Sequence, residues 1–369
     1  MENKRLVALD VFRGMTLALM LIVNNPGDWG QVFDPFLHAD WHGCTLTDLV
    51  FPFFLFIVGV AIPLAFSSRQ IEGFKKKDLY LKILKRTVLI FLIGLALSGF
   101  PYYKLGSIRI PGVLQRIALV YGFVAILYLR FKPKELFIIL IIILLVYWAL
   151  MTLIRVPGLG YASLEPETNL GAWLDYKLLK GHLWSASKVW DPEGLLSTLP
   201  ACGTGIIGVL TGLAIKRPNP LREKVNRIFF YGAILLCIGY FWNMVFPFNK
   251  KIWTSSFVVF TGGLGLMVLA SLIYIIDIKK MDRWTHHFLY FGMNSMMVFV
   301  GSGLVARLMG LITWMHQGTK MTLKGFLYQG LKQSWLDPKV SSLLFALGFL
   351  GLFYVLLRWM YNKRIFWKL

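Results

Sequence analysis

The segment FLHADWHGCTLTDLVFP, residues 36–52, gathers side chains that can transfer protons. His38 and His42 flank Asp40, and Asp48 follows His38 by ten residues. An imidazole has an ordinary pKa of about 6.5, so it can act as a general base near neutral pH. A carboxylate held against such a ring selects its tautomer and stabilises the imidazolium. The spacing therefore makes His38 and Asp48 candidates for a catalytic pair.

Two other interpretations of this segment are open. His38, Asp40 and His42 form HxDxH, and alternate side chains of an extended backbone lie on one side, so a metal-dependent hydrolase is one hypothesis. No other histidine or carboxylate cluster on the same side completes a site, and we expect no metal. TLTD at 45–48 also matches a capping box, with Thr45 as N-cap of the next helix. Capping is compatible with catalysis, because it would fix Asp48 in a first turn.

The elements that must position these residues are membrane helices. The chain has 369 residues, of which 57% are hydrophobic and 15% charged, whereas about a quarter are charged in a soluble domain. Runs long enough to cross a bilayer predict a single transmembrane domain over 1–369, an all-α polytopic bundle of about ten spans. The run 87–100 is short, and 288–312 is a candidate for a break. The runs are 6–24, 46–66, 87–100, 112–129, 136–154, 196–215, 228–247, 254–276, 288–312 and 341–360.

The basic residues that give the formal net charge of +21 are distributed unequally between the two sides of the membrane. With the N-terminus inside, the inner segments carry roughly twice as many Lys and Arg as the outer ones. This predicts cytoplasmic N- and C-termini, and we expect no nucleic-acid partner. The same topology sends His38 to the outer side. Three cysteines without CxxC spacing predict neither a disulfide framework nor a thiolate metal site.

The longest loop, about 155–195, lies on the predicted outer side and is rich in tryptophan and tyrosine. Long loops of this kind often act as lids, so we expect a substrate lid. For a single residue such as Trp173, Trp184 or Trp190, an interfacial aromatic belt is the simpler interpretation.

GTGIIG at 203–208 matches a dinucleotide-binding pattern only in its letters. That site requires a preceding strand and a βαβ unit, whereas this segment lies inside an apolar helical run. Gly208 and Gly212 also form a GxxxG pair, which lets two membrane helices approach closely. We therefore interpret these glycines as packing residues.

Charged and polar residues within the spans are candidates for binding an anionic ligand, because a charge in a membrane is costly unless it is paired or faces a wet cavity. Asp10 and Arg13 share a helix face, so they form either a neutralising pair or a site for an anion arriving from the cytoplasm. Arg116 has no acid within a helical turn, which indicates an anionic partner or an acid on another helix.

Three further polar or aromatic residues have two interpretations each. Asn294 and Ser295 either make interhelical hydrogen bonds or contact a ligand. Trp253 lies at an outer edge, where it could line a site or anchor the chain in the interface.

Several motifs together resemble the transmembrane acyltransferases related to heparan-alpha-glucosaminide N-acetyltransferase, above all bacterial members that consist of the membrane domain alone. They occur in the family's order and cover nearly the whole chain: LDVFRGMTLALMLIVNN, HADWHGCTLTDLVFPFFLFIVG, LQRIAL, DPEGLLSTLPA and GMNS. The resemblance implies a multi-pass enzyme of the bacterial inner membrane that moves acetyl groups from cytoplasmic acetyl-CoA to an amino sugar on the far side. It also implies a homodimer. Heparan sulfate is not carried over as the acceptor, because this chain lacks a large luminal domain before the first span.

The resemblance also assigns roles. The family's active-site histidine maps onto His38, its aspartate onto Asp48, and an asparagine after the first span onto Asn24. The lysosomal enzyme has asparagine where this chain has His42, which leaves the role of His42 open. On this basis His38 is expected to act as base or as acetyl relay, and Asn24 as oxyanion donor.

Acetyl-CoA would enter a slot whose basic inner half holds the nucleotide. The hypothesis assigns Arg13 or Arg116 to charge compensation there, with Asn294, Ser295 and Trp253 as further lining residues. The competing class is a small-molecule transporter, which ten spans and intramembrane charges also suit. Transporters place their sites near the bilayer midplane, whereas the best cluster here is at the outer lip.

Overall fold

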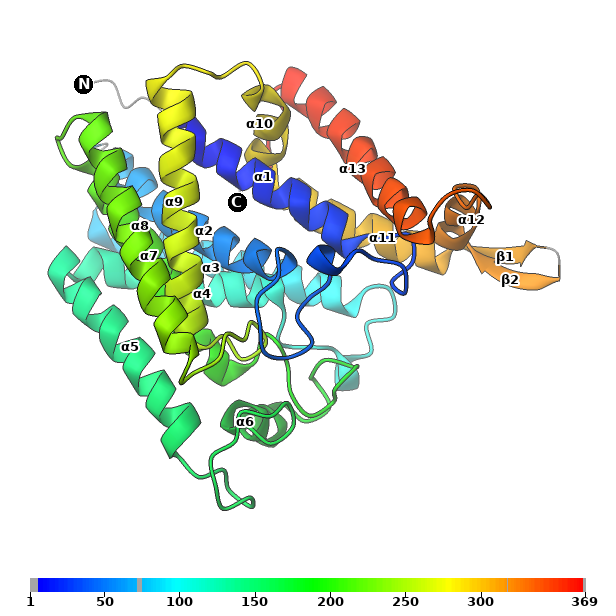
Figure 1. Cartoon of the computed structure of the whole chain (residues 1–369), viewed down its shortest axis with the longest axis horizontal. Coiled ribbons are helices and arrows are strands. Elements are labelled where there is room, and N and C mark those ends of the chain that lie inside the picture. Colours follow the sequence, from blue (N-terminus) through cyan, green and yellow to red (C-terminus); the bar gives the residue numbers. More distant parts are fainter. Residues whose placement is uncertain (1–5, 72–74, 317, 368–369) are drawn as a thin grey trace.

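The computed structural model describes residues 6–71, 75–316 and 318–367 as a bundle of long helices with short connections (Figure 1). The long helices are α1 (Val7–Asn24), α2 (Val50–Ile71), α3 (Lys76–Gly99), α4 (Val113–Arg130), α5 (Pro133–Leu153), α7 (Leu195–Lys216), α8 (Leu221–Asn243), α9 (Ser255–Leu272) and α13 (Pro338–Asn362). Shorter helices are α6 (Leu170–Leu179), α10 (Thr285–Met293), α11 (Ser302–Leu311) and α12 (Leu323–Gln329). The π-helical turns are Ile273–Ile278 and Met297–Gly301, and the 3₁₀ turns are Asp34–Phe36, Thr47–Leu49 and Leu105–Ser107.

The helices confirm the predicted class of a multi-pass, all-α membrane bundle. Within the described residues, eight helices are long and apolar enough to cross a membrane. The predicted break in 288–312 is also present, because α10 and Met297–Leu311 meet at an angle of 79°.

The predicted short run 87–100 is the apolar half of the 24-residue α3. Its first turns carry Lys76, Lys82 and Arg86, whose long side chains can reach the polar interface while the helix continues.

Glycines hold α2 and α7 against each other. A Cβ on Gly208 would lie 2.2 Å from the carbonyl oxygen of Phe56, and a Cβ on Gly59 would lie 2.2 Å from that of Gly205. A Cβ on Gly212 would also meet the α2 backbone, at 2.6 Å. The packing interpretation of GTGIIG is therefore confirmed, because the backbones of α2 and α7 pack directly against each other.

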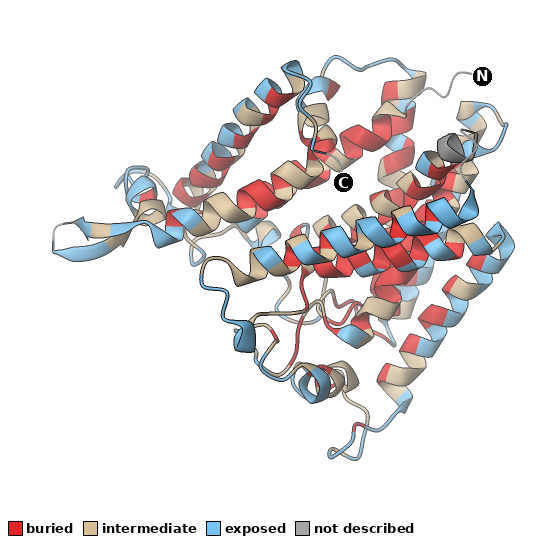
Figure 2. Cartoon of the chain, turned by 180° about the vertical axis from the view of Figure 1, so that it is seen from behind, coloured by how far each residue is buried: buried red, intermediate tan, exposed pale blue. Residues whose placement is uncertain are grey.

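Burial divides the helices into inner and outer ones (Figure 2). α1 and α7 are the most buried spans, whereas α5 and α8 expose most of their length. The exposed faces are apolar, as a lipid environment requires: Phe230 and Phe241 on α8 and Ile142 on α5 are largely exposed. A groove of about 690 Å³ runs between α8 and α9 on this apolar side.

The loops 25–46, 154–169, 180–194 and 244–254 gather at one end of the bundle, together with α6 (Figure 1). We call this the loop end, and it is the end that the charge pattern predicts to face outward. The antiparallel hairpin β1 (Thr313–His316) and β2 (Thr319–Thr322) projects separately from the bundle (Figure 1). The sequence did not predict this hairpin, α6 or α12.

Candidate active site

His38 and Asp48 meet at the loop end. His38 Nδ1 lies 2.6 Å from Asp48 Oδ1, while the backbone N–H groups of Ala39 and Thr45 donate to Oδ2, both at 3.1 Å. The carboxylate is buried, and the imidazole remains 41% exposed. Because an ionised carboxylate only accepts hydrogen bonds, Nδ1 carries the proton of the neutral ring. The lone pair of Nε2 is thus left to face a substrate.

The local fold explains how Asp48 is fixed, with one difference from the predicted capping box. The carboxylate does reach back to the N–H of Thr45, as the acid of a capping box should. However, the first helical turn begins at Thr47 with Leu46 at the N-cap position. The Thr45 hydroxyl lies 2.6 Å from the carbonyl oxygen of Leu37. Thr45 therefore ties the two ends of the His38 loop together instead of capping the helix.

Lys250 is a third group at this site. Its Nζ lies 3.3 Å from both Nδ1 and Nε2 of His38. An atom equally far from both nitrogens lies over the face or the Cε1 side of the ring, so it leaves the in-plane direction of Nε2 open. Burial lowers the pKa of Lys250 from its ordinary value. The sequence did not predict a role for Lys250.

The turn that carries Lys250 is rigid. The buried Asn249 accepts hydrogen bonds at Oδ1 from the N–H groups of Lys251 (2.8 Å) and Ile252 (3.0 Å). Lys251 points to the other side of the turn, where its Nζ donates to the carbonyl oxygen of Asp40 and lies 5.8 Å from the Trp41 ring centroid. The two adjacent lysines thus have different surroundings. Lys250 contacts the imidazole, and Lys251 contacts the loop backbone.

Trp253 and Arg116 pack together behind this turn. Trp253 is fully buried, and its Nε1 donates to Thr204 Oγ1 at 3.2 Å, so the interfacial-anchor interpretation is wrong. The Arg116 guanidinium lies 5.3 Å from the indole centroid. Its Nη2 donates to the carbonyl oxygen of Gly194 at 3.0 Å and to the Ser197 hydroxyl. Within the described residues, Nε and Nη1 of this buried side chain have no hydrogen-bond partner.

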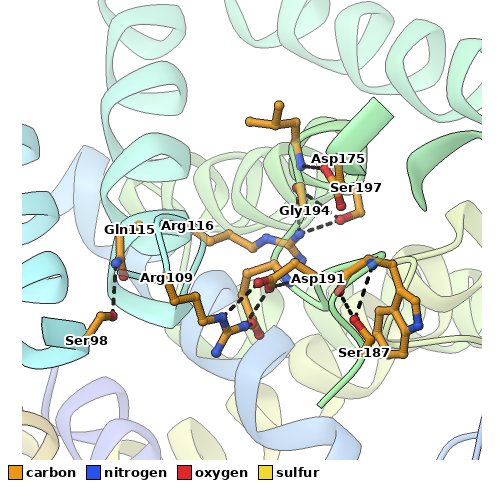
Figure 3. A network of polar contacts seen from close by, with 12 residues as sticks. Ser98, Arg109, Gln115, Arg116, Asp175, Ser187, Asp191, Gly194 and Ser197 are labelled. Atoms are coloured by element: carbon orange, nitrogen blue, oxygen red, sulfur yellow. Dashed lines mark hydrogen bonds and ion pairs between the residues drawn. The ribbon is translucent and has the colours of Figure 1, made fainter. Parts of the chain in front are cut away.

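An ion-pair network joins the segment before α7 to the loop before α4 (Figure 3). Arg109 donates from Nε and Nη2 to the two oxygens of Asp191, at 2.8 and 2.5 Å, and from Nη2 to Glu193 at 2.6 Å. Although burial disfavours its charge, these acids raise the pKa of Arg109. Asp175 on α6 accepts the N–H of Leu195 at 2.8 Å. The network fixes the N-terminal end of α7, to which Arg116 binds.

Loop 155–195 contacts the His38 loop through Trp41. The Trp41 Nε1 donates to the carbonyl oxygen of Leu164 at 2.9 Å, and its ring lies edge-on to that of Trp190 at 5.2 Å. Trp184 extends this cluster, 5.6 Å from Trp190. Trp190 is buried in the cluster, so the aromatic-belt interpretation is wrong for it. The contacts place part of the predicted lid beside the loop that joins His38 to Asp48.

His42 does not join the other groups of HxDxH. Its Nδ1 lies 3.5 Å from the side-chain nitrogen of Asn249, and burial lowers its pKa. His38 is instead turned toward Asp48. Among the described residues, no group of three or more His, Cys, Asp or Glu side chains is arranged to hold a metal ion.

The other predicted residues fall away from His38. On α1, Arg13 Nη1 contacts Asp10 Oδ1 at 2.9 Å and the carbonyl oxygen of Gly292 at 3.3 Å, which is the predicted ion pair. The buried Asn294 lies just beyond Gly292, at the break after α10, and Ser295 follows it half-buried. The Asn294 amide binds the carbonyl oxygen of Ile365 (3.2 Å) and the N–H of Trp367 (3.0 Å).

The residues expected to bind the donor therefore form two groups. Arg13 and Asn294 flank the crossing of α1 and α10, whereas Arg116 and Trp253 lie at the loop end. Asn24, the last residue of α1, is exposed. Within the described residues, no hydrogen bond joins Asn24 to His38 or Asp48.

Comparison with known proteins gives one family. The model for "Heparan-alpha-glucosaminide N-acetyltransferase, catalytic" matches residues 5–179. The chain is 32% identical over 353 residues to heparan-alpha-glucosaminide N-acetyltransferase of Homo sapiens, covering 80% of this chain and 52% of the relative. The protein of the same name from Mus musculus is 29% identical over 421 residues, covering 99% of this chain and 60% of the relative. The chain thus spans between half and two thirds of the length of these relatives.

Proposed function

Because the chain is related to the heparan-alpha-glucosaminide N-acetyltransferase family, we propose that it transfers an acetyl group from acetyl-CoA to the amine of an amino sugar. The protein is an integral, multi-pass membrane protein. The donor arrives from the cytoplasmic end of the bundle, and the acceptor binds at the loop end, outside the membrane.

The observation that carries the proposal is the contact of 2.6 Å between His38 Nδ1 and Asp48 Oδ1. An amino sugar is an ammonium ion near neutral pH and must lose a proton before it attacks a thioester. Nε2 of His38 can accept that proton, while Asp48 holds the tautomer and stabilises the imidazolium. The half-exposed ring lies where a polar sugar can reach it.

The donor is proposed to lie along the two groups of residues described above. Arg13, Asn294 and Ser295 are nearer the end at which α1 begins, where the nucleotide of acetyl-CoA enters. Arg116 and Trp253 lie at the loop end, where the thioester must arrive. The two unpartnered N–H groups of Arg116 fit an oxygen of the acyl arm better than the nucleotide phosphates, which revises the role assigned to this residue from the sequence. Asn24 is proposed as an oxyanion donor.

Two routes use the same nitrogen. In direct transfer, Nε2 takes the proton of the amine as it attacks the thioester. In the relay, Nε2 attacks first, the thiolate of CoA leaves, and the acceptor amine then takes the acetyl group from the imidazole. Label from acetyl-CoA on the His38 ring in the absence of acceptor, found by peptide mass spectrometry after a short incubation, identifies the relay.

An acetyl-transfer assay in proteoliposomes tests the function. Radiolabelled acetyl-CoA is supplied on one side and a panel of amino sugars on the other. The assay compares wild type with His38→Ala, and His316→Ala, on the separate hairpin, is the control variant. We expect label on at least one amino sugar, and a loss of about 10²–10⁴-fold in kcat for His38→Ala alone. Equal transfer by both variants would remove the assignment of His38, and no transfer to any amine would remove the function.

A further inference from the structure

The amine of Lys250 lies beside the position that the proposed reaction requires of its substrate, over the face or the Cε1 side of the His38 ring. An acceptor amine must come close to Nε2 of His38, and Lys250 Nζ already lies 3.3 Å from this atom. The lysine is presented by the rigid turn that Asn249 stabilises, so this position does not depend on a mobile loop. We propose that Lys250 is an internal acetyl acceptor, which the enzyme acetylates when no sugar is bound. This inference rests on the proposed function.

The chemistry balances with the groups present and the proposed donor. Neutral Nζ attacks the thioester carbon, and one of its two protons passes to Nε2 of His38. The C–S bond breaks, CoA leaves as the thiolate, and the imidazolium gives it that proton, so that CoA thiol, neutral His38 and an Nζ-acetyl amide remain. On the relay route, Nζ attacks the acetyl group carried by Nε2, and the N–C bond to the ring breaks. Lys250 is therefore acetylated on either route.

The charges around Lys250 set the pH dependence of this step. Only the neutral amine is a nucleophile, and burial lowers the pKa of Lys250. The lysine therefore loses its proton at a lower pH than a solvated lysine does, and acetylation should rise as pH increases toward the ordinary value of about 10.4. Two of the facing groups favour the ammonium and two oppose it: Glu193 and Asp48 raise the pKa, whereas Lys251 and Arg116 lower it.

Acetylation of Lys250 would change the site itself. The amide carries no charge and is larger than the amine, so it would extend from beside the His38 ring into the neighbouring space at Nε2, where the acceptor must bind. Incubation with acetyl-CoA alone should thus inactivate the enzyme slowly, and a bound amino sugar should prevent this. Lys250 would couple the activity to the supply of acceptor.

The test uses the full-length protein in nanodiscs with isotope-labelled acetyl-CoA and no sugar, at about pH 7 and about pH 9, followed by peptide mass spectrometry. Lys251 is the internal control, because it is the next residue of the same loop. Its amine contacts the carbonyl oxygen of Asp40 instead of His38. We expect label on Lys250 to exceed that on Lys251 by about 10²-fold, to increase with pH, and to disappear in His38→Ala and His38→Gln. Lys251→Arg should retain the label on Lys250, and Lys250→Arg should resist the slow inactivation.

Each outcome decides between the inference and the function on which it rests. Transfer to glucosamine with Lys250 unlabelled would overturn the inference and leave the proposed function intact. Equal label on Lys250 and Lys251, or label that persists in folded His38 variants, would show uncatalysed acetylation and also overturn it. Transfer to neither sugar nor lysine would overturn both. Normal elution profiles and melting temperatures identify the variants that are folded.

Discussion

At the scale of single residues, His38 depends on a partner whose own position is fixed by backbone N–H groups. Asp48 holds Nδ1, and Ala39 and Thr45 hold Asp48. The free lone pair on Nε2 follows from this arrangement. The thiol of Cys44, between the two, does not compete as a nucleophile, because burial and the charge of Asp48 raise its pKa to about 12.

Asp48→Asn tests the tautomer. The amide would offer an N–H to Nδ1, so the ring proton would move to Nε2 and the base would lose its lone pair. We expect kcat to fall by about 10²–10⁴-fold while binding of acetyl-CoA changes little. Steady-state kinetics on the folded variant measures both, and Asp40→Asn, at an exposed neighbouring carboxylate, is the matched control. Similar kcat values for the two variants would contradict the role of Asp48.

Sequence spacing could predict the His38–Asp48 pair because both residues belong to one short segment that folds locally. It could not predict Lys250, which is 212 residues away from His38. Nor could it predict that Arg116 contacts Trp253, since that contact depends on how α4 packs against the turn before α9. For Asn24, the structure shows an exposed position at the end of α1 and leaves its role a prediction.

At the scale of the elements, the N-terminal end of α7 connects loop 155–195 to the candidate site. Arg116 and Asp175 bind it from α4 and α6, and a Cβ on Gly194 would lie 1.9 Å from the Asp175 carboxylate. Burial raises the pKa of Asp175 from 3.8 to about 6. The folded state therefore binds more protons than the unfolded state between these values, and this group destabilises α6 as pH rises through that range.

Asp175→Asn should remove this penalty, since the amide is neutral at every pH and can still accept the N–H of Leu195. Above about pH 6 we expect the variant to be more stable than wild type by up to about 3 kcal/mol, with little difference below about pH 4. Thermal unfolding and hydrogen exchange of the α6 segment at both pH values measure this. If Asp175→Asn were less stable than wild type by the same amount at both pH values, the predicted stabilisation would be contradicted.

Periodicity and hydropathy could predict most elements, because a membrane span needs a long apolar run. They also predicted a break within 288–312 and close helix packing at the glycines of α7, but not that α2 is the partner. The same signals could not predict α6, since it is only ten residues long. Its N-terminus is capped by the side chain of Asn169, which accepts the N–H of Ala172. The extension of α3 was missed because its first turns are basic.

At the scale of the whole molecule, the charge pattern and the site predict the same orientation. The loops around His38 lie at one end of the bundle. The segments between α4 and α5 and between α9 and α10, which carry basic residues, belong to the connections at the other end. We therefore expect the candidate base on one side of the membrane and the basic segment 279–283 on the other. A transferase that takes its donor from the cytoplasm requires this arrangement.

Labelling with an impermeant thiol reagent tests the orientation. In a background without Cys44, Cys202 and Cys237, we expect Asp40→Cys to react in intact cells, and Lys134→Cys, at the exposed start of α5, to react only after the membrane is opened. Retained acetyl transfer shows that the background is folded. The reverse pattern of labelling would mean that the site faces the cytoplasm.

The most direct measurement is a structure of the protein with a non-transferable acetyl-CoA analogue. We predict that the carbonyl carbon of the analogue lies within about 6 Å of His38 Nε2. This distance leaves room for one attacking amine that is about 3 Å from each of the two atoms. An analogue whose acyl group rests at the other end of the bundle, with packed side chains between it and His38, would contradict the account.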